Sequence, residues 1–128
     1  PSKKIFQVGI RSGTKSEFLE MNKTKRLIQH NLGENAKYLE EALKSFKGAP
    51  IYLTCDLDWF DPSIMPGTGT PEPGGYFWGD FAAVVDVIKS HNLIGADVVE
   101  LSPKFDNSGI SSVLAAKVIR SLIMLLNK

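Results

Sequence analysis

The stretch YLTCDLDWFDPSIMPGTGTPEPGG, residues 52–75, decides the fold of this chain. Its first part is an apolar run that ends in two aspartates one residue apart, Asp56 and Asp58. Its second part is a loop rich in proline, glycine and threonine, a composition that fixes a backbone conformation firmly. Rigid loops at strand ends usually position functional groups, so this stretch predicts a strand that leads into a functional site.

The residues on either side of this stretch alternate between strand-like and helix-like patterns. Apolar residues three to four positions apart indicate helices, whereas short apolar runs indicate strands. The predicted elements are a strand at 5–10, a loop at 11–18, one or two helices within 23–46 broken near Gly33, a buried strand at 51–58, a helix at 80–90, a strand at 95–101 and a helix at 111–126. This order predicts an α/β fold of three αβα layers, in which helices cover the faces of a parallel sheet.

Composition and charge limit the class of protein. A chain of 128 residues, 43% of them hydrophobic, is expected to form one domain with a modest core. The net charge of +1 argues against nucleic acid or a membrane surface as a partner. The single cysteine, Cys55, suits a reducing compartment, and with no membrane-span or signal-peptide pattern we expect a cytoplasmic protein. The start at Pro1, close to strand-like residues, suggests a fragment of a longer chain.

The two aspartates need a counter-charge. On a continuing strand, Asp56 and Asp58 project from the same face with their Cα atoms roughly 7 Å apart. If their oxygens lie about 6 Å apart, their repulsion is on the order of 3 kcal/mol at an effective dielectric constant of about 20. The flanking YLTC and WF segments are uncharged. Because carboxylate oxygens are the ligands that Mg²⁺, Mn²⁺ and Ca²⁺ prefer, we expect a divalent metal ion at this pair.

A third carboxylate, Glu100, ends the apolar run ADVVE and precedes a turn at LSP. The carboxyl ends of parallel strands meet at one edge of a sheet, so a neighbouring strand brings Glu100 near the aspartate pair. In the alternative interpretation, Asp56 and Asp58 only cap the loop and the next helix, Asp61 makes an Asx-type turn, and Glu100 lies at the sheet rim. Cys55, on the strand face opposite Asp56, is predicted to be a buried, inert thiol.

Three segments together resemble one known family. TCDLDWFDPSIMPGTGTPEPGG (residues 54–75) resembles the last signature of the ureohydrolases, which include arginase, agmatinase and formiminoglutamase. In that signature a strand ends in D-x-D-x-x-x-P and continues into a P-G-T-G-T-P-x-P-G-G loop. GADVVELSPKFDNSG (residues 95–109) resembles the following family strand, and VGIRSG (residues 8–13) resembles the preceding one. The segments GTGTPEPGG and GADVVE resemble agmatinases more than arginases.

The resemblance implies a chemistry and assigns residues to it. Asp56 and Asp58 match the two family aspartates that help to hold a pair of Mn²⁺ ions, which activate a hydroxide for attack on a guanidinium carbon. Glu100 matches the glutamate that pairs with the substrate guanidinium, and Thr70 matches a loop threonine near that group. The implied reaction is hydrolysis of a guanidino compound, agmatine to putrescine and urea, as a step of polyamine biosynthesis.

The chain also departs from the family pattern. Family members are typically more than twice this long, and their earlier half carries a G-G-D-H motif, a D-A-H-x-D motif and a proton-shuttling histidine that have no counterpart in this sequence. The chain therefore resembles the C-terminal part of a single ureohydrolase domain, and we expect it to be inactive alone. Two kinds of partner are possible, namely further copies of this chain in a homo-oligomer and a missing N-terminal half. YFWGDF replaces the family's T-x-x-E run after Gly75, which leaves the next helix start open.

Two other classes of function compete with this interpretation. Phosphatases of the haloacid dehalogenase type also place D-x-D after a buried strand, with Mg²⁺ as cofactor. Their motif continues with Thr or Val where this chain has Phe60, and it normally opens the domain, which disfavours this class. The stronger rival is a non-catalytic fragment or binding module, because Asp56, Asp58 and Glu100 alone do not complete a two-metal centre of the family's kind.

Overall fold

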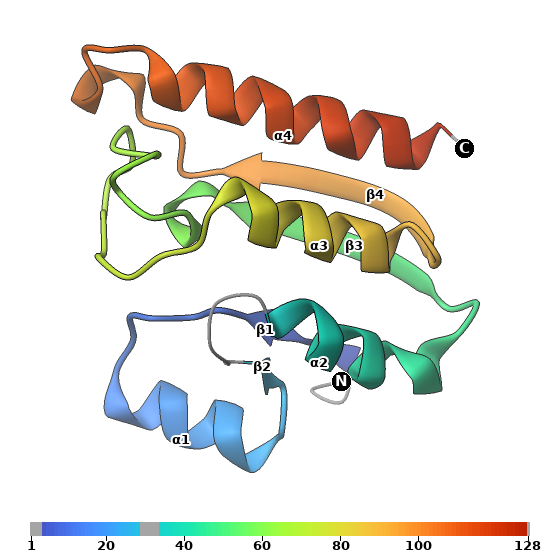
Figure 1. Cartoon of the computed structure of the whole chain (residues 1–128). Helices are drawn as coiled ribbons and strands as arrows, with labels where there is room; N and C mark the ends of the chain where they lie inside the picture. The colour runs from blue at the N-terminus through green and yellow to red at the C-terminus, as the bar shows by residue number, and fades with distance from the viewer. Residues whose placement is uncertain (1–3, 29–33, 128) are drawn as a thin grey trace.

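The computed structural model describes residues 4–28 and 34–127 (Figure 1). Its helices and strands are, in chain order, β1 Gln7–Val8, α1 Lys15–Lys23, β2 Leu27–Ile28, α2 Asn35–Leu43, β3 Pro50–Asp56, α3 Trp78–Ile88, β4 Asn92–Val99 and α4 Ile110–Leu126. Short 3₁₀ turns cover Lys44–Phe46, Leu57–Trp59 and Pro103–Phe105. None of the described helices has both the length and the apolar composition of a membrane span.

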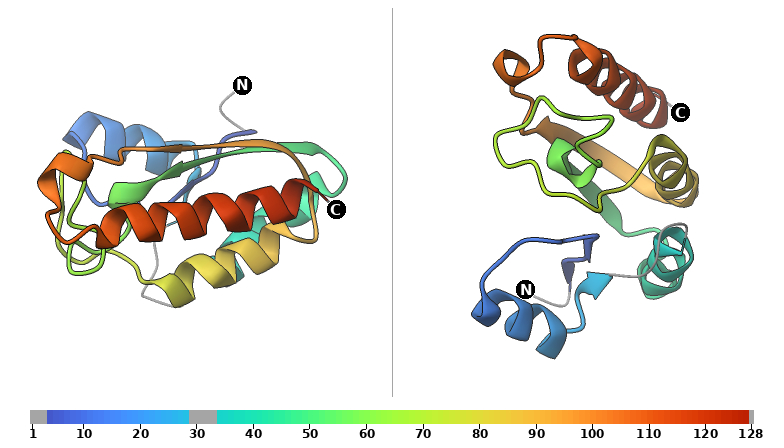
Figure 2. Two further views of the ribbon diagram at one scale, coloured as in Figure 1. Left: turned by 90° about the horizontal axis from the view of Figure 1, so that it is seen from above. Right: turned by 60° about the vertical axis from the view of Figure 1, so that its left-hand side comes forward.

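The strands pair in parallel, as the sequence predicts. β1 pairs with β2, and β3 pairs with β4 in a register that runs from Pro50 opposite Asn92 to Asp56 opposite Val99. Within the described residues these are two separate two-stranded sheets. Helices α2 and α3 lie on one side of the strands and α1 lies on the other (Figure 2). The prediction of an α/β fold with parallel strands between helical layers is confirmed.

One helix and one strand were not predicted. The segment expected to be a loop at 11–18 contains the start of α1, because Thr14 and Glu17 form a reciprocal capping box. The Glu17 amide donates to Thr14 Oγ1 at 3.3 Å, and the Thr14 amide donates to Glu17 Oε2 at 2.7 Å. The helix expected within 23–46 is interrupted by β2, and α2 begins only at Asn35. The predicted break near Gly33 lies outside the described residues.

Strand boundaries also shift. β3 ends at Asp56, not at residue 58, and β4 runs from Asn92 to Val99 in place of 95–101. β3 was predicted to be a buried strand, but only one of its faces is covered. Its odd-numbered residues Ile51, Leu53 and Cys55 are half-buried against the core, whereas Tyr52, Thr54 and Asp56 are exposed. Asp56 therefore ends its strand with its side chain accessible.

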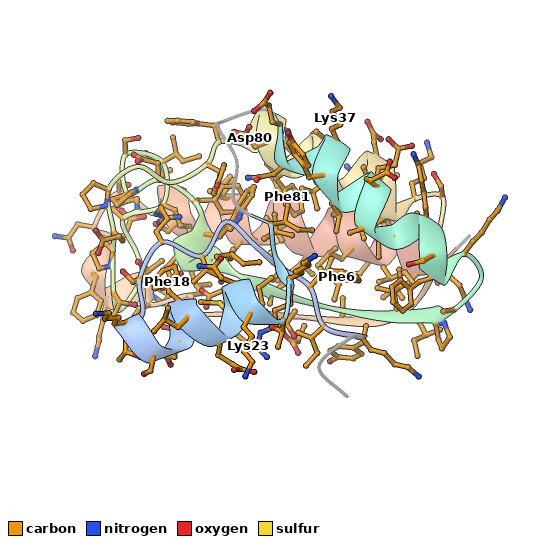
Figure 3. The ribbon with its side chains drawn as sticks, turned by 90° about the horizontal axis from the view of Figure 1, so that it is seen from below. Phe6, Phe18, Lys23, Lys37, Asp80 and Phe81 are labelled. Atoms are coloured by element: carbon orange, nitrogen blue, oxygen red, sulfur yellow. The ribbon has the colours of Figure 1, made fainter. Side chains whose placement is uncertain are left out.

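The core lies between the strands and the helices. Leu57 and Val118 are fully buried, and Phe60 and Met65 are nearly so. Figure 3 shows Phe81 of α3 in the interior, whereas Lys23 of α1 and Lys37 of α2 lie at the surface. α4 packs along β4 through residues spaced three to four apart, namely Ser111, Ala115, Val118, Leu122 and Leu125. This packing places the carboxyl ends of β3 and β4 and the loop at 60–77 at one end of the molecule, on the left in Figure 1.

Candidate metal and substrate site

The first aspartate ends β3 and the second lies in the turn that follows. Leu57–Trp59 forms a 3₁₀ turn, so Asp58 does not lie on the continuing strand that the prediction for Asp56 and Asp58 had assumed. The turn forms here because Asp56 Oδ1 accepts a hydrogen bond from the Asp58 amide at 3.1 Å. Asp56 therefore does cap the turn, as the alternative interpretation held, but only Oδ1 takes part in that bond.

The loop returns to the second aspartate through its threonine. Thr70 Oγ1 donates to Asp58 Oδ2 at 2.9 Å, although twelve positions separate the two residues. Thr70 and Asp58 come from the two halves of the segment at 52–75 that the sequence predicts to be functional. This bond holds Oδ2 of the Asp58 carboxylate against the loop.

Glu100 reaches the same place from β4. Asp56 lies opposite Val99 in the parallel register, so Glu100 follows directly after the partner of Asp56. Its carboxylate lies beside the loop, since Oε2 is 3.6 Å from the position that a Cβ on Gly69 would take. Glu100 has a backbone φ of +68°, in the left-handed region that non-glycine residues rarely adopt. Such strain is typical of functional positions.

The surroundings of Asp56 raise its proton affinity. Partial desolvation by the surrounding chain, together with the negative charges of Asp58 and Glu100, raises the pKa of Asp56 to about 6 from its ordinary 3.8. In the described part of the chain, no basic side chain forms an ion pair with these carboxylates. A cluster of acidic groups without a protein counter-ion favours a bound cation, and its hard oxygen donors fit Mn²⁺ or Mg²⁺.

The donor set is incomplete. Across residues 4–28 and 34–127, no three or more His, Cys, Asp or Glu side chains are arranged to hold a metal ion together. Asp56 and Asp58 thus fit a divalent ion in their chemistry, but only as part of a ligand set.

Asp61 fixes the shape of the loop. Its Oδ2 accepts hydrogen bonds from the amides of Gly74 and Gly75, both at 3.0 Å, and its Oδ1 accepts from the amide and hydroxyl of Ser63. These bonds, those from Ser63 foremost, lower the pKa of Asp61 to about 2. The Asx-type turn predicted for Asp61 is confirmed, and the same carboxylate also closes the far end of the loop.

A second anchor joins the loop to α4. The Gly67 amide donates to Ser111 Oγ at 2.8 Å, and the Gly67 carbonyl accepts from the Ser102 amide at 2.7 Å. A Cβ on Gly67 would lie 2.8 Å from Ser111 Cβ and Oγ, so only glycine fits this approach. Asp106 in turn accepts from the Ser111 amide at 2.7 Å, which holds the start of α4 in place.

A third anchor comes from Arg11, at the segment that follows β1. Its guanidinium donates to the main-chain carbonyls of Asp58 at 2.7 Å, Trp59 at 2.9 Å and Glu72 at 2.9 Å. Ser12 Oγ adds a bond to Glu72 Oε2 at 3.1 Å. The sequence pattern did not predict this role, because nothing local to Arg11 identifies a partner so distant in the chain. Its place at a strand's carboxyl end was the one available signal.

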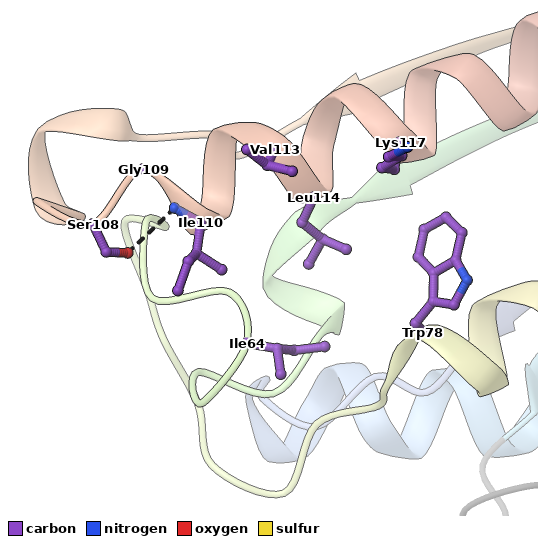
Figure 4. A pocket seen from close by; sticks show the side chains of 8 residues that line it. All are labelled: Ile64, Trp78, Ser108, Gly109, Ile110, Val113, Leu114 and Lys117. Atoms are coloured by element: carbon purple, nitrogen blue, oxygen red, sulfur yellow. Dashed lines mark hydrogen bonds between the residues drawn. The ribbon is translucent and has the colours of Figure 1, made fainter.

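Two further features lie outside the carboxylate cluster. Cys55 is a half-buried thiol whose pKa burial raises to about 12, as expected of an inert residue. An open apolar pocket lies between the loop, the start of α3 and the start of α4 (Figure 4). Side chains such as Ile64, Trp78 and Leu114 line this pocket, and no acidic residue does, so it is not the place for a cationic guanidino group.

The predicted site residues therefore come together. Asp56 and Asp58 at the end of β3, Thr70 in the loop and Glu100 after β4 all lie at one edge of the sheet. Arg11, Gly67 and Ser111, which hold this arrangement, were not predicted.

Comparison with known proteins shows the family of this chain. A model of the arginase family matches residues 1–125. The agmatinase of Chromobacterium violaceum is 36% identical over 124 residues, which is 97% of this chain and 38% of that protein. The agmatinase of Bacillus subtilis is 37% identical over 122 residues, 94% of this chain and 41% of that protein.

Solved structures give the same result. The proclavaminate amidino hydrolase of Streptomyces clavuligerus superimposes with a TM-score of 0.83 at 28% identity, covering 98% of this chain and 44% of that one. The arginase of Bacillus subtilis superimposes with a TM-score of 0.82 at 25% identity, covering 99% of this chain and 45% of that one. The chain thus spans less than half the length of these relatives. It belongs to the arginase family, and its D-x-D segment, loop and Glu100 stand together in an agmatinase-like, partial arginase fold.

Proposed function

We propose that residues 1–128 form the C-terminal part of a single ureohydrolase domain that depends on manganese and hydrolyses a guanidino compound, with agmatine as the substrate. The observation that supports this most is that Asp56, Asp58 and Glu100 lie together beside the loop, where partial desolvation and the charges of Asp58 and Glu100 raise the pKa of Asp56. Proteins named agmatinase, guanidinobutyrase and guanidinopropionase match 97%, 69% and 69% of this chain. We further propose a cytoplasmic location and a part in polyamine biosynthesis.

Each residue has a role in this proposal. Asp56 and Asp58 would hold Mn²⁺ through carboxylate oxygens, and Thr70 orients Asp58 through its hydrogen bond. When bound, the metal lowers the pKa of a water molecule and so supplies the nucleophile. The Glu100 carboxylate accepts charge-assisted hydrogen bonds from the planar guanidinium, which orients its carbon toward the aspartates.

The 128-residue chain alone is expected to bind Mn²⁺ weakly and to release no urea, because the rest of the metal ligands are not found in the described residues. Calorimetric titration with Mn²⁺ tests the first point, and a urea assay with agmatine tests the second. Asp58→Asn should remove the weak binding, whereas Asp86→Asn, which changes an exposed carboxylate on α3, should not. Efficient urea release by this chain alone would contradict the proposal that the chain carries only part of the site.

The rival classes make different predictions in the same experiment. A phosphatase would hydrolyse a generic aryl phosphate with Mg²⁺, which the ureohydrolase proposal does not expect. A non-catalytic fragment would bind no Mn²⁺ even at millimolar concentration, and Asp58→Asn would then change nothing.

A further inference from the structure

The side chain of Arg11 joins three parts of the chain that are far apart in sequence. Its Nη2 donates to the carbonyls of Asp58 at 2.7 Å and Glu72 at 2.9 Å, and its Nη1 donates to the carbonyl of Trp59 at 2.9 Å. Asp58 and Trp59 belong to the 3₁₀ turn after β3, whereas Glu72 lies on the returning arm of the loop. One guanidinium thus connects the segment after β1 to both arms of the loop.

Only a guanidinium suits these acceptors. The carbonyls of Asp58, Trp59 and Glu72 converge on one place, and their partial negative charges favour a cation there. The planar fork of arginine presents donors in fixed directions, whereas the ammonium of lysine is one strongly hydrated nitrogen. Ser12 adds a bond from its hydroxyl to the Glu72 side chain at 3.1 Å, so two consecutive residues hold the same arm.

The contacts of Arg11 bear directly on a candidate metal ligand. The carbonyl that it binds most closely belongs to Asp58, whose carboxylate accepts the Thr70 hydroxyl at 2.9 Å. Thr70 and Glu72 lie on the same arm, two residues apart. If the Arg11 side chain is removed, the turn and the returning arm lose the partner that they share. The hydrogen bond between Thr70 and Asp58 then has to hold the two segments together without the bonds of Arg11.

We propose that Arg11 is a positioning residue of the site: it clamps the turn that carries Asp58 against the loop arm that carries Thr70. The metal role of Asp58 rests on the function proposed above, but the clamp itself rests only on the hydrogen bonds of Arg11. Arg11 acts through main-chain carbonyls, and none of its described hydrogen bonds is to a carboxylate oxygen.

Hydrogen exchange of the loop amides tests the clamp. The amides of Gly74 and Gly75 donate to Asp61, and the Tyr76 amide donates to the Trp59 carbonyl, so all three report the closure of the loop. In Arg11→Met these amides should exchange faster by about tenfold or more, while amides of β4 and α4 keep their rates. Arg11→Lys should restore little of the protection, because its ammonium cannot reproduce the fork. Arg26→Met is the matched control: Arg26 is also a half-buried arginine next to a short strand, but it lies directly before β2 and not after β1.

Unchanged exchange at Gly74–Tyr76 in Arg11→Met would overturn the proposal. Equal acceleration in the loop, β4 and α4 would also overturn it, because Arg11 would then contribute only to global stability. Should Arg11→Met fail to fold, Arg11→Lys carries the same comparison.

Binding of Mn²⁺ alone, followed by the electron paramagnetic resonance signal of the free ion, separates the clamp from the proposed function. Arg11→Lys should bind about tenfold more weakly than the unsubstituted chain under conditions in which both are fully folded, a result that a merely structural role would not give. If the unsubstituted chain binds no Mn²⁺, the metal role of Asp58 fails, and the exchange data still decide whether Arg11 clamps the loop. Weaker Mn²⁺ binding in Arg26→Met as well would contradict a specific role for Arg11.

Discussion

Substitution of Gly75 by alanine should separate the end of the loop from the segment at 60–61 and destabilise the chain. A Cβ at this buried position would lie 2.4 Å from the Asp61 amide nitrogen, 2.6 Å from Asp61 Cα and 2.6 Å from the Phe60 carbonyl carbon. All three are main-chain atoms, which cannot rotate away, so the two chain segments must separate by about 1 Å to reach an ordinary contact distance. Overpacking of this kind costs about 1–3 kcal/mol.

The same displacement breaks hydrogen bonds that join these segments. The Asp61 amide donates to the Tyr76 carbonyl at 3.0 Å, and the Tyr76 amide donates to the Trp59 carbonyl at 3.1 Å. Since each such bond contributes about 1 kcal/mol, the free energy of unfolding should fall by about 4 kcal/mol in total. With an m-value of about 2 kcal/mol/M, the urea midpoint should fall by about 2 M.

Urea titration followed by tryptophan fluorescence measures this change, because Trp59 stacks on Tyr76 with ring centroids 4.4 Å apart. Gly79→Ala is the matched control: it lies in α3, where a Cβ meets nothing within 4 Å, and it should stabilise the chain by about 0.5–1 kcal/mol. If Gly75→Ala is as stable as the unsubstituted chain to within about 0.5 kcal/mol, the close approach of the two segments is not present in solution.

Three further substitutions or modifications probe the site. In the metal-free chain the pKa of Asp56 is raised to about 6, so the folded state holds this proton more tightly than the unfolded state, and stability should decrease as pH rises from about 4 to about 6. Asp56→Asn should remove this decrease and raise the urea midpoint at pH 7; a lower midpoint would refute the electrostatic account. Ser111→Ala leaves the Gly67 amide buried without an acceptor and should destabilise the chain by about 1–3 kcal/mol. Ser112→Ala, on the exposed side of α4, should have no effect. Equal urea midpoints for the two variants would show that the hydrogen bond from Gly67 to Ser111 is dispensable. Alkylation of Cys55 by iodoacetamide at pH 8, followed by mass spectrometry, should be about a hundredfold slower in the folded than in the urea-unfolded chain, and similar rates would show that the thiol is not buried.

The parts of the fold that sequence patterns predicted are those with a strong local signal. The apolar runs before Asp56 and Glu100 identified the two longest strands, and their parallel pairing brought both carboxylates to one edge as expected. The start of α1 escaped prediction because Gly13 suggested a loop, although the T-x-x-E spacing of Thr14 and Glu17 carried a capping signal. β2 is two residues long, too short for a strand pattern to be distinguished from helical spacing.

The residues of the candidate site likewise fall into those that the sequence predicted and those that it did not. Asp56, Asp58, Thr70 and Glu100 could be named because each ends a strand or belongs to a distinctive loop. The residues that hold them could not be named, because the bonds of Arg11 to Asp58 and Glu72 join positions 47 and 61 residues apart. Such contacts depend on how the elements pack, and no periodicity along the chain encodes them. The turn at Asp58 was missed because the side chain of Asp56 accepts a hydrogen bond from the Asp58 amide, which ends the strand.

Urea release by a chimaera tests the central claim most directly. In the chimaera, this chain replaces the 124 matched residues of the Chromobacterium violaceum agmatinase, so that the remainder of that protein completes the site. The proposal predicts Mn²⁺-dependent release of urea from agmatine, reduced by at least about a hundredfold in Asp58→Asn and unchanged in Asp86→Asn. A folded chimaera that releases no urea, or one whose urea release survives Asp58→Asn, would contradict the assignment of this chain to a ureohydrolase site.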